Sequence, residues 1–91
     1  MPRLNRDVMN MAAPRDVAMA SMTVLDRLQD FRPEIQIMGA AAVFLELAAH
    51  LGIPAQEAFT ATKNLINGDD GKRAEFRAIG AYLKGEVNVE V

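Results

Sequence analysis

The chain has no cysteine and no tryptophan, and two other residues with useful chemistry occur only once. Ser21 is the single serine and His50 the single histidine among 91 residues. Without cysteine, disulfide bonds, thiolate metal sites and cysteine nucleophiles are excluded. No nucleophile motif surrounds Ser21 or His50. We therefore expect a protein that is not an enzyme and that carries no cofactor and no metal.

An excess of charge of one sign is also missing. The formal net charge is −2, from 10 basic and 12 acidic residues. Such a balance gives no general attraction to nucleic acids or to anionic membranes, so binding of either kind would need a local basic patch.

The length and the apolar content predict one small folded domain over residues 1–91. Hydrophobic residues make up 51% of the chain. A chain of this size leaves a large share of its surface exposed, and oligomerisation is a common way to bury more of it. The composition is that of a globular protein rather than a disordered one.

The longest apolar stretch, Ile35 to Leu51, has nearly the length of a membrane span. It is interrupted by Gln36, Glu46 and His50, whereas a span needs about 20 residues with few or no charges. We interpret it as a buried helix. We see no secretory leader at Met1 either, so we expect a cytoplasmic protein without a membrane partner.

Proline and glycine divide the chain into four predicted helices, which makes the expected fold class all-α. Their expected ranges are 15–30, 33–51, 54–66 and 72–84. The helix at 33–51 is apolar on nearly every side, so we expect it at the centre of a compact four-helix domain. Gly52 is placed to end it as a left-handed cap.

The two ends of the chain are less determined. Residues 1–13 form either a loosely docked arm or a short helix capped by Asn5. Residues 86–91 alternate apolar and polar side chains, which is typical of a strand. We expect this tail to be loose, or else to pair with another chain.

All six methionines lie within the first 38 residues, and residues 1–22 are more apolar than an exposed arm should be. Methionine adapts to irregular surfaces and is common where proteins bind partners, although it also fills loosely packed cores. We therefore predict a homo-oligomer, and a two-fold dimer is the commonest form. The predicted partner-binding residues are Met9, Met11, Val17, Met19 and Met22.

A second hypothesis comes from residues 47–54, which resemble the turn of a helix-turn-helix motif. Ala48 takes the small position, Gly52 the turn and Ile53 the apolar position that follows. The same pattern also describes an ordinary capped turn between two helices. In the DNA-binding alternative Phe59 faces outward, whereas the helical pattern by itself places it inward. The nucleic-acid-binding residues would be Gln56, Thr60, Lys63, Arg73 and Arg77.

Catalysis has one weak candidate. Glu46 and His50 are four residues apart and therefore meet on one helix face, where they could move a proton or contribute to a metal site. Two ligands do not make a site, and a polar stripe on an apolar helix explains the pair equally well.

Two stretches carry a resemblance to known proteins. Residues 33–38 with the alanine-rich segment after them, and residues 54–60, resemble parts of small helical proteins encoded by tailed bacteriophages, a broad group rather than one family. Many of these have unknown roles. The resemblance implies an accessory or regulatory protein that binds a host or phage protein, and it assigns no functional residue.

Overall fold

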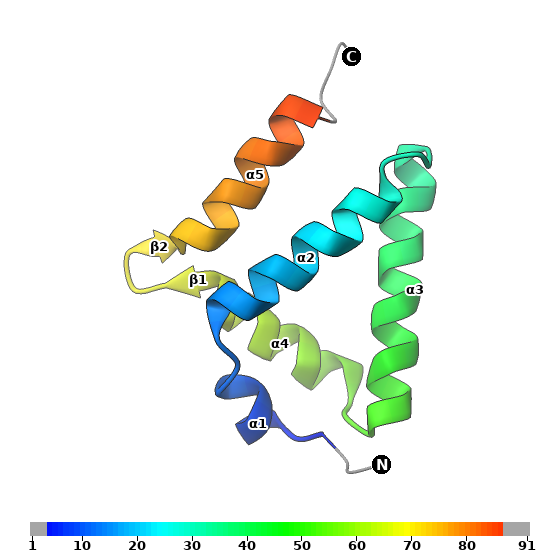
Figure 1. The fold of residues 1–91 in the computed structure, drawn as a ribbon. Coiled ribbons are helices and arrows are strands. Elements are labelled where there is room, and N and C mark those ends of the chain that lie inside the picture. Colours follow the sequence, from blue (N-terminus) through cyan, green and yellow to red (C-terminus); the bar gives the residue numbers. More distant parts are fainter. Residues whose placement is uncertain (1–3, 87–91) are drawn as a thin grey trace.

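The computed structural model describes residues 4–86 and shows five helices and one small hairpin (Figure 1). The predicted all-α class is confirmed. Residues 87–91 of the predicted tail lie outside the described range. In chain order the elements are α1 (Arg6–Asn10), α2 (Pro14–Leu28), α3 (Pro33–Leu51), α4 (Ala55–Ile66), β1 (Asn67–Gly68), β2 (Gly71–Lys72) and α5 (Ala74–Glu86).

The helix ends follow local signals in the sequence. The side chain of Asn5 accepts a hydrogen bond from the backbone N–H of Val8 at 2.9 Å, so the N-terminal segment holds the short helix α1. Pro33 occupies the first turn of α3. Gly52 ends α3 with φ +77°, as the sequence predicts, and the amide of Ile53 donates to the carbonyl of Ala48 at 3.0 Å.

The turn between α4 and α5 is a two-stranded antiparallel hairpin. Asn67 is paired with Lys72 and Gly68 with Gly71, and Asp69 and Asp70 form the connection. Because residues 71–72 belong to this hairpin, α5 begins at Ala74 and not at residue 72. The side chain of Arg73 donates from Nε to the carbonyl of Leu65 at 2.6 Å and so fastens the hairpin to the end of α4.

Helix packing is arranged around α4 and along α2. The main packed pairs are α1 on α4, α3 on α4 and α2 on α5 (Figure 1). The amide of Leu4 donates to the carbonyl of Leu51 at 2.8 Å, which ties the N-terminal segment to the end of α3. The side chain of Gln36 donates to the carbonyl of Leu28 at 2.9 Å and joins the start of α3 to the end of α2. The resulting molecule is flat, with extents of 43 × 31 × 18 Å.

The buried core is small and is made mostly of alanine. Six of the described residues are buried, and four of the six are alanines. The buried residues are Ala18, Ala48, Ile53, Ala58, Ala61 and Phe76. Ala48, Ile53 and Ala58 cluster where α3 meets α4, with Leu4, Met9, Phe44 and Ala55 packed around them. This core cluster therefore lies at the contact between α3 and α4.

The predicted burial of α3 is wrong. Its limits, Pro33–Leu51, are as expected, but it lies along one side of the molecule in Figure 1, and Ala48 is its one buried residue. The physical reason is that α4 covers only one strip of the helix, near the C-terminal end. The other sides carry large apolar side chains that no described part of this chain covers.

Candidate interaction surfaces

The five predicted partner-binding residues do not form one continuous surface. Met11 and Met19 are exposed, with 83% and 59% of their surface accessible. Met9, Val17 and Met22 are half-buried. Met9 is packed against the alanine-rich core, so part of its apolar surface is already used within the chain.

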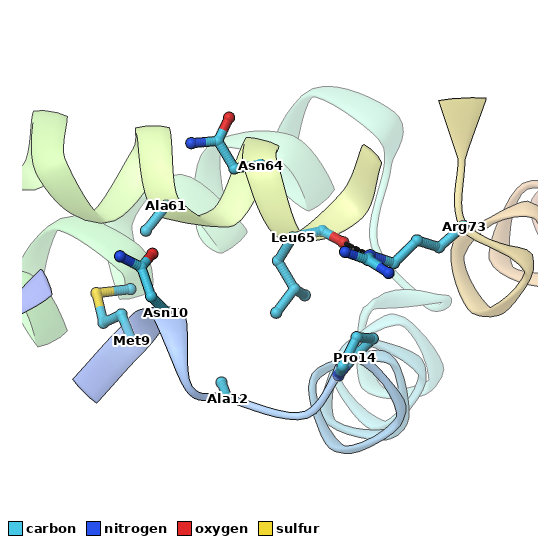
Figure 2. Close-up of a pocket in the computed structure, with 8 residues that line it drawn as sticks. All are labelled: Met9, Asn10, Ala12, Pro14, Ala61, Asn64, Leu65 and Arg73. Carbon is cyan, nitrogen blue, oxygen red and sulfur yellow. Dashed lines mark hydrogen bonds between the residues drawn. The ribbon is translucent and has the colours of Figure 1, made fainter. Parts of the chain in front are cut away.

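Met9 also lines a hollow between α1 and α4, which Figure 2 shows. The hollow has a volume of about 420 Å³. In the figure the side chain of Leu65 projects from α4 toward the segment that holds Ala12 and Pro14. Arg73 closes one end, with its guanidinium held on the carbonyl of Leu65. The lining is completed by Asn10, Ala61 and Asn64.

Met19 and Met22 belong to a separate, shallow depression on α2. It is lined by these two methionines with Arg15, Ala18 and Glu75. Apolar atoms form its floor, and the charged residues lie on opposite sides of the α2–α5 packing. This part of the predicted surface is open to a partner.

The largest uncovered apolar surface lies on α3, which the sequence-based reasoning assigned to the core. The exposed large apolar side chains of this helix are Ile35, Ile37, Met38, Val43, Leu45 and Leu47, and Phe31 is exposed just before it. Of these, Ile37 and Met38 are the most open, at 71% and 69%. The helix is therefore apolar on its solvent side as well as toward α4.

One regular row can be followed along this surface, and we call it the α3 seam. It consists of Ile35, Met38, Ala42, Leu45 and Ala49 on α3, together with Phe31 just before the helix, and all of these residues are exposed. Their alternating spacing of four and three residues is the heptad spacing of a helix that packs against another helix. This spacing is the sequence signal that would have singled out this surface.

Charged groups lie at the ends of the α3 seam. The guanidinium of Arg32 contacts the carboxylate of Glu34 at 2.6 Å, and both side chains are exposed. The pKa of Glu34 is lowered from its ordinary value, first by a hydrogen bond from backbone N–H and then by the Arg32 side chain. Glu46 and His50 are exposed on the second half of the helix, where they border a shallow apolar depression with Ala42, Val43 and Leu47.

By length and composition α3 also meets the criteria for a membrane-crossing helix. It has 19 residues and a mean hydropathy of 1.3 over the best window, of which 6% is buried. Core helices and signal sequences meet the same criteria, so this property alone is weak support for a span. Glu46 and His50 would both have to enter the hydrocarbon region, which is unfavourable.

The predicted nucleic-acid-binding residues fall into two groups. Gln56, Thr60 and Lys63 share one side of α4, and Gln56 donates to the Thr60 hydroxyl at 3.4 Å. Phe59 lies on this side too, half-exposed, with the Lys63 ammonium 5.5 Å from its ring centroid. The expectation that Phe59 faces inward is therefore wrong, because Ala58 and Ala61 supply the buried side of α4.

Arg73 and Arg77 form the second group, at the hairpin. Their guanidinium groups donate to the backbone carbonyls of Leu65 and Lys72. Both residues remain exposed, but their orientation is set by the hairpin and not by α4.

Groups suited to catalysis are not assembled in the part of the chain that the structure describes. Within residues 4–86, no three His, Asp or Glu side chains come together as metal ligands. The hydroxyl of Ser21 donates to the carbonyl of Val17 at 2.9 Å, as expected for a serine inside a helix. Comparison with protein-family models, curated proteins and solved structures finds no match for this chain. The function must therefore be inferred from the surfaces themselves.

Proposed function

We propose that the protein is a non-catalytic interaction protein that acts as a homo-oligomer, with the apolar surface of α3 as its main contact. The observation that supports this proposal is that α3, the most apolar helix of the chain, leaves six large apolar side chains exposed. Exposed apolar surface of this extent is unfavourable in water and marks sites where proteins bind. Met11 and Met19 are further exposed apolar side chains in the N-terminal part of the chain.

The total exposed area supports the same proposal. The chain exposes 6948 Å². A folded protein of 9.9 kDa is expected to expose about 5,200 Å². A standard protein interface buries about 800 Å² on each partner. Contact with one further copy of the chain would therefore bring the exposed area closer to the expected value.

The resemblance to small phage-encoded helical proteins fits a regulatory or accessory role of this kind. Such a role needs no catalytic group, only a stable shape and a surface for a partner. A cytoplasmic location is part of the same proposal.

Solution mass tests the proposal directly. We expect sedimentation equilibrium of the purified chain, from 5 to 300 µM, to give a dimer or a higher oligomer. A monomer at every concentration would overturn the proposal. Co-sedimentation with phosphatidylcholine–phosphatidylglycerol vesicles, in place of self-association, would assign α3 to a membrane and would overturn it equally.

A second candidate function, DNA binding, is supported by one observation. Gln56, Thr60 and Lys63 share one side of the helix that follows the Gly52 turn, with Gln56 and Lys63 exposed and Thr60 half-buried, where a recognition helix presents its base-reading residues. Mobility shift with duplex DNA at 50 mM salt tests it. We expect Lys63→Ala to weaken any binding several-fold and Lys84→Ala, which removes an exposed lysine of α5, to leave it unchanged. No retardation at tens of micromolar protein would exclude this function.

A further inference from the structure

We infer that α3 binds α3 of a second copy in an antiparallel pair, along the α3 seam. This inference rests on the proposed function and deepens it, because it names the partner, the residues and the orientation. It starts from a free side of the helix. Phe44 and Ala48 lie toward α4, while Gln36 is held on the end of α2. The α3 seam lies on neither of these sides, and all its members are exposed.

The composition of the seam suits the close approach of two helices. It contains no charged or polar side chain over 19 residues, from Phe31 to Ala49. Two of its positions are alanines, which allow helix axes to come near the lower end of the usual 8–10 Å spacing. The larger residues of the seam, Ile35, Met38 and Leu45, can then insert as knobs into the facing helix.

The order of large and small residues favours the antiparallel orientation. With a two-fold axis beside residue 40, Met38 of one copy faces Ala42 of the other, and Ile35 faces Leu45. At each end, Phe31 faces Ala49. Large side chains then oppose smaller ones in two of the three kinds of layer, which fills the interface evenly. A parallel pair would stack Ala42 on Ala42 and Ala49 on Ala49, and would leave voids beside crowded layers.

Charge complementarity favours the same orientation. In the antiparallel pair, Arg32 at the start of each α3 comes to the level of Glu46 of the other copy. Within residues 4–86, Arg32 forms one ion pair, with the exposed carboxylate of Glu34. Because the Arg32 side chain is itself exposed, a second acid can reach it. The opposed helix dipoles add a small further attraction. In a parallel pair, the Arg32 residues of the two copies would lie side by side and repel each other.

Disulfide trapping tests the orientation, because the chain has no cysteine of its own. We would prepare Ile35→Cys and Leu45→Cys as separate variants and oxidise each alone and in a 1:1 mixture. We expect the mixed disulfide in the mixture and little cross-linking of either variant alone. Two copies of residue 35 would lie about 15 Å apart in the antiparallel pair. A disulfide requires Cα atoms within roughly 7 Å. Rapid cross-linking of Ile35→Cys with itself would overturn the inference.

A pair of matched variants tests the residues of the seam. Met38→Glu places a charge on the seam, whereas Ile37→Glu places the same charge on the neighbouring residue, which is equally exposed but lies off the seam. We expect Met38→Glu to weaken self-association at least tenfold and Ile37→Glu to change it less than threefold. Circular dichroism of both variants checks that the helices remain formed.

The outcomes separate this inference from the proposed function. A wild-type chain that is monomeric contradicts both. A wild-type oligomer that forms no mixed disulfide and tolerates Met38→Glu contradicts the antiparallel seam and leaves the proposed function standing. If Met38→Glu fails to fold, the trapping result alone decides between the two orientations.

Discussion

Single residues fix where the helices of this chain end. Gly52 is the clearest case, because its φ of +77° lies in the left-handed region that residues with a Cβ rarely adopt. Gly80, by contrast, is an interior residue of α5, and a Cβ added there would meet nothing within 4 Å. The same substitution at these two positions should therefore change stability in opposite directions.

We expect Gly52→Ala to lower the free energy of unfolding by about 1–2 kcal/mol, because alanine must adopt an unfavourable backbone conformation. We expect Gly80→Ala to raise it by about 0.5–1 kcal/mol, because alanine is the better helix former. Urea unfolding at a fixed protein concentration measures both. Equal effects of the same sign would show that the Gly52 conformation is not required.

The ion pair at the start of α3 makes a prediction about pH. The pKa of Glu34 is lowered, so the stabilisation that this group provides is present above its ordinary pKa and is lost as the pH falls through the lowered value. We expect Arg32→Ala to raise the pKa of Glu34 part of the way back, because the larger contribution, from the backbone hydrogen bond, remains. Carboxyl-carbon NMR titration measures this change. A pKa that does not move on substitution would assign the whole effect to the backbone.

At the scale of the elements, the sequence predicted the two ends of α3 correctly and its burial wrongly. Pro33 and Gly52 are local signals, and α3 begins and ends where they place it. Burial is decided by the rest of the structure, and hydrophobicity does not tell whether the covering surface comes from the same chain or from another. The sequence therefore predicted that α3 needs cover, but assigned that cover to the other helices of the chain.

The sequence predicted only part of the exposed apolar surface, because composition alone does not tell which apolar residues are covered. Methionine content identified Met11 and Met19, which are exposed. The same argument could not separate them from Met9, which is packed against the core. The α3 seam was missed because the hydrophobic residues around the whole helix concealed its heptad spacing.

The packing of α4 makes a prediction of its own. Ala58 is 3% exposed and belongs to the cluster with Ala48 and Ile53. We expect Ala58→Leu to lower the free energy of unfolding by about 1–3 kcal/mol, because the larger side chain has no room between α3 and α4. Gln56→Leu, on the exposed side of α4, is the matched control and should be nearly neutral. A neutral Ala58→Leu, measured by urea unfolding, would mean that this junction is loosely packed.

The molecule as a whole is more spread out than its length requires. Its radius of gyration is 14.1 Å, compared with about 12 Å for a typical domain of this length. Together with the small core, this shape indicates that an isolated copy is only weakly stable. A second copy would supply the missing burial.

Thermal stability should therefore depend on concentration. We expect the Tm of the wild-type chain to rise by on the order of 5 °C over a hundredfold increase in protein concentration, because association stabilises only the folded state. Scanning calorimetry at 3 µM and 300 µM tests this. The Tm of Met38→Glu should change less over the same range. A wild-type Tm that is independent of concentration would contradict assembly in this range.

The thickness of the molecule, 18 Å, has a consequence for its backbone. A helix with its side chains is about 10–12 Å across, so the slab holds fewer than two full layers and encloses no helix on all sides. Amide hydrogens in a single copy then exchange with deuterium through small local openings, without waiting for global unfolding. Slow exchange would arise only where another surface covers the helix. Slowly exchanging amides along α3 would therefore map the residues that a bound partner covers.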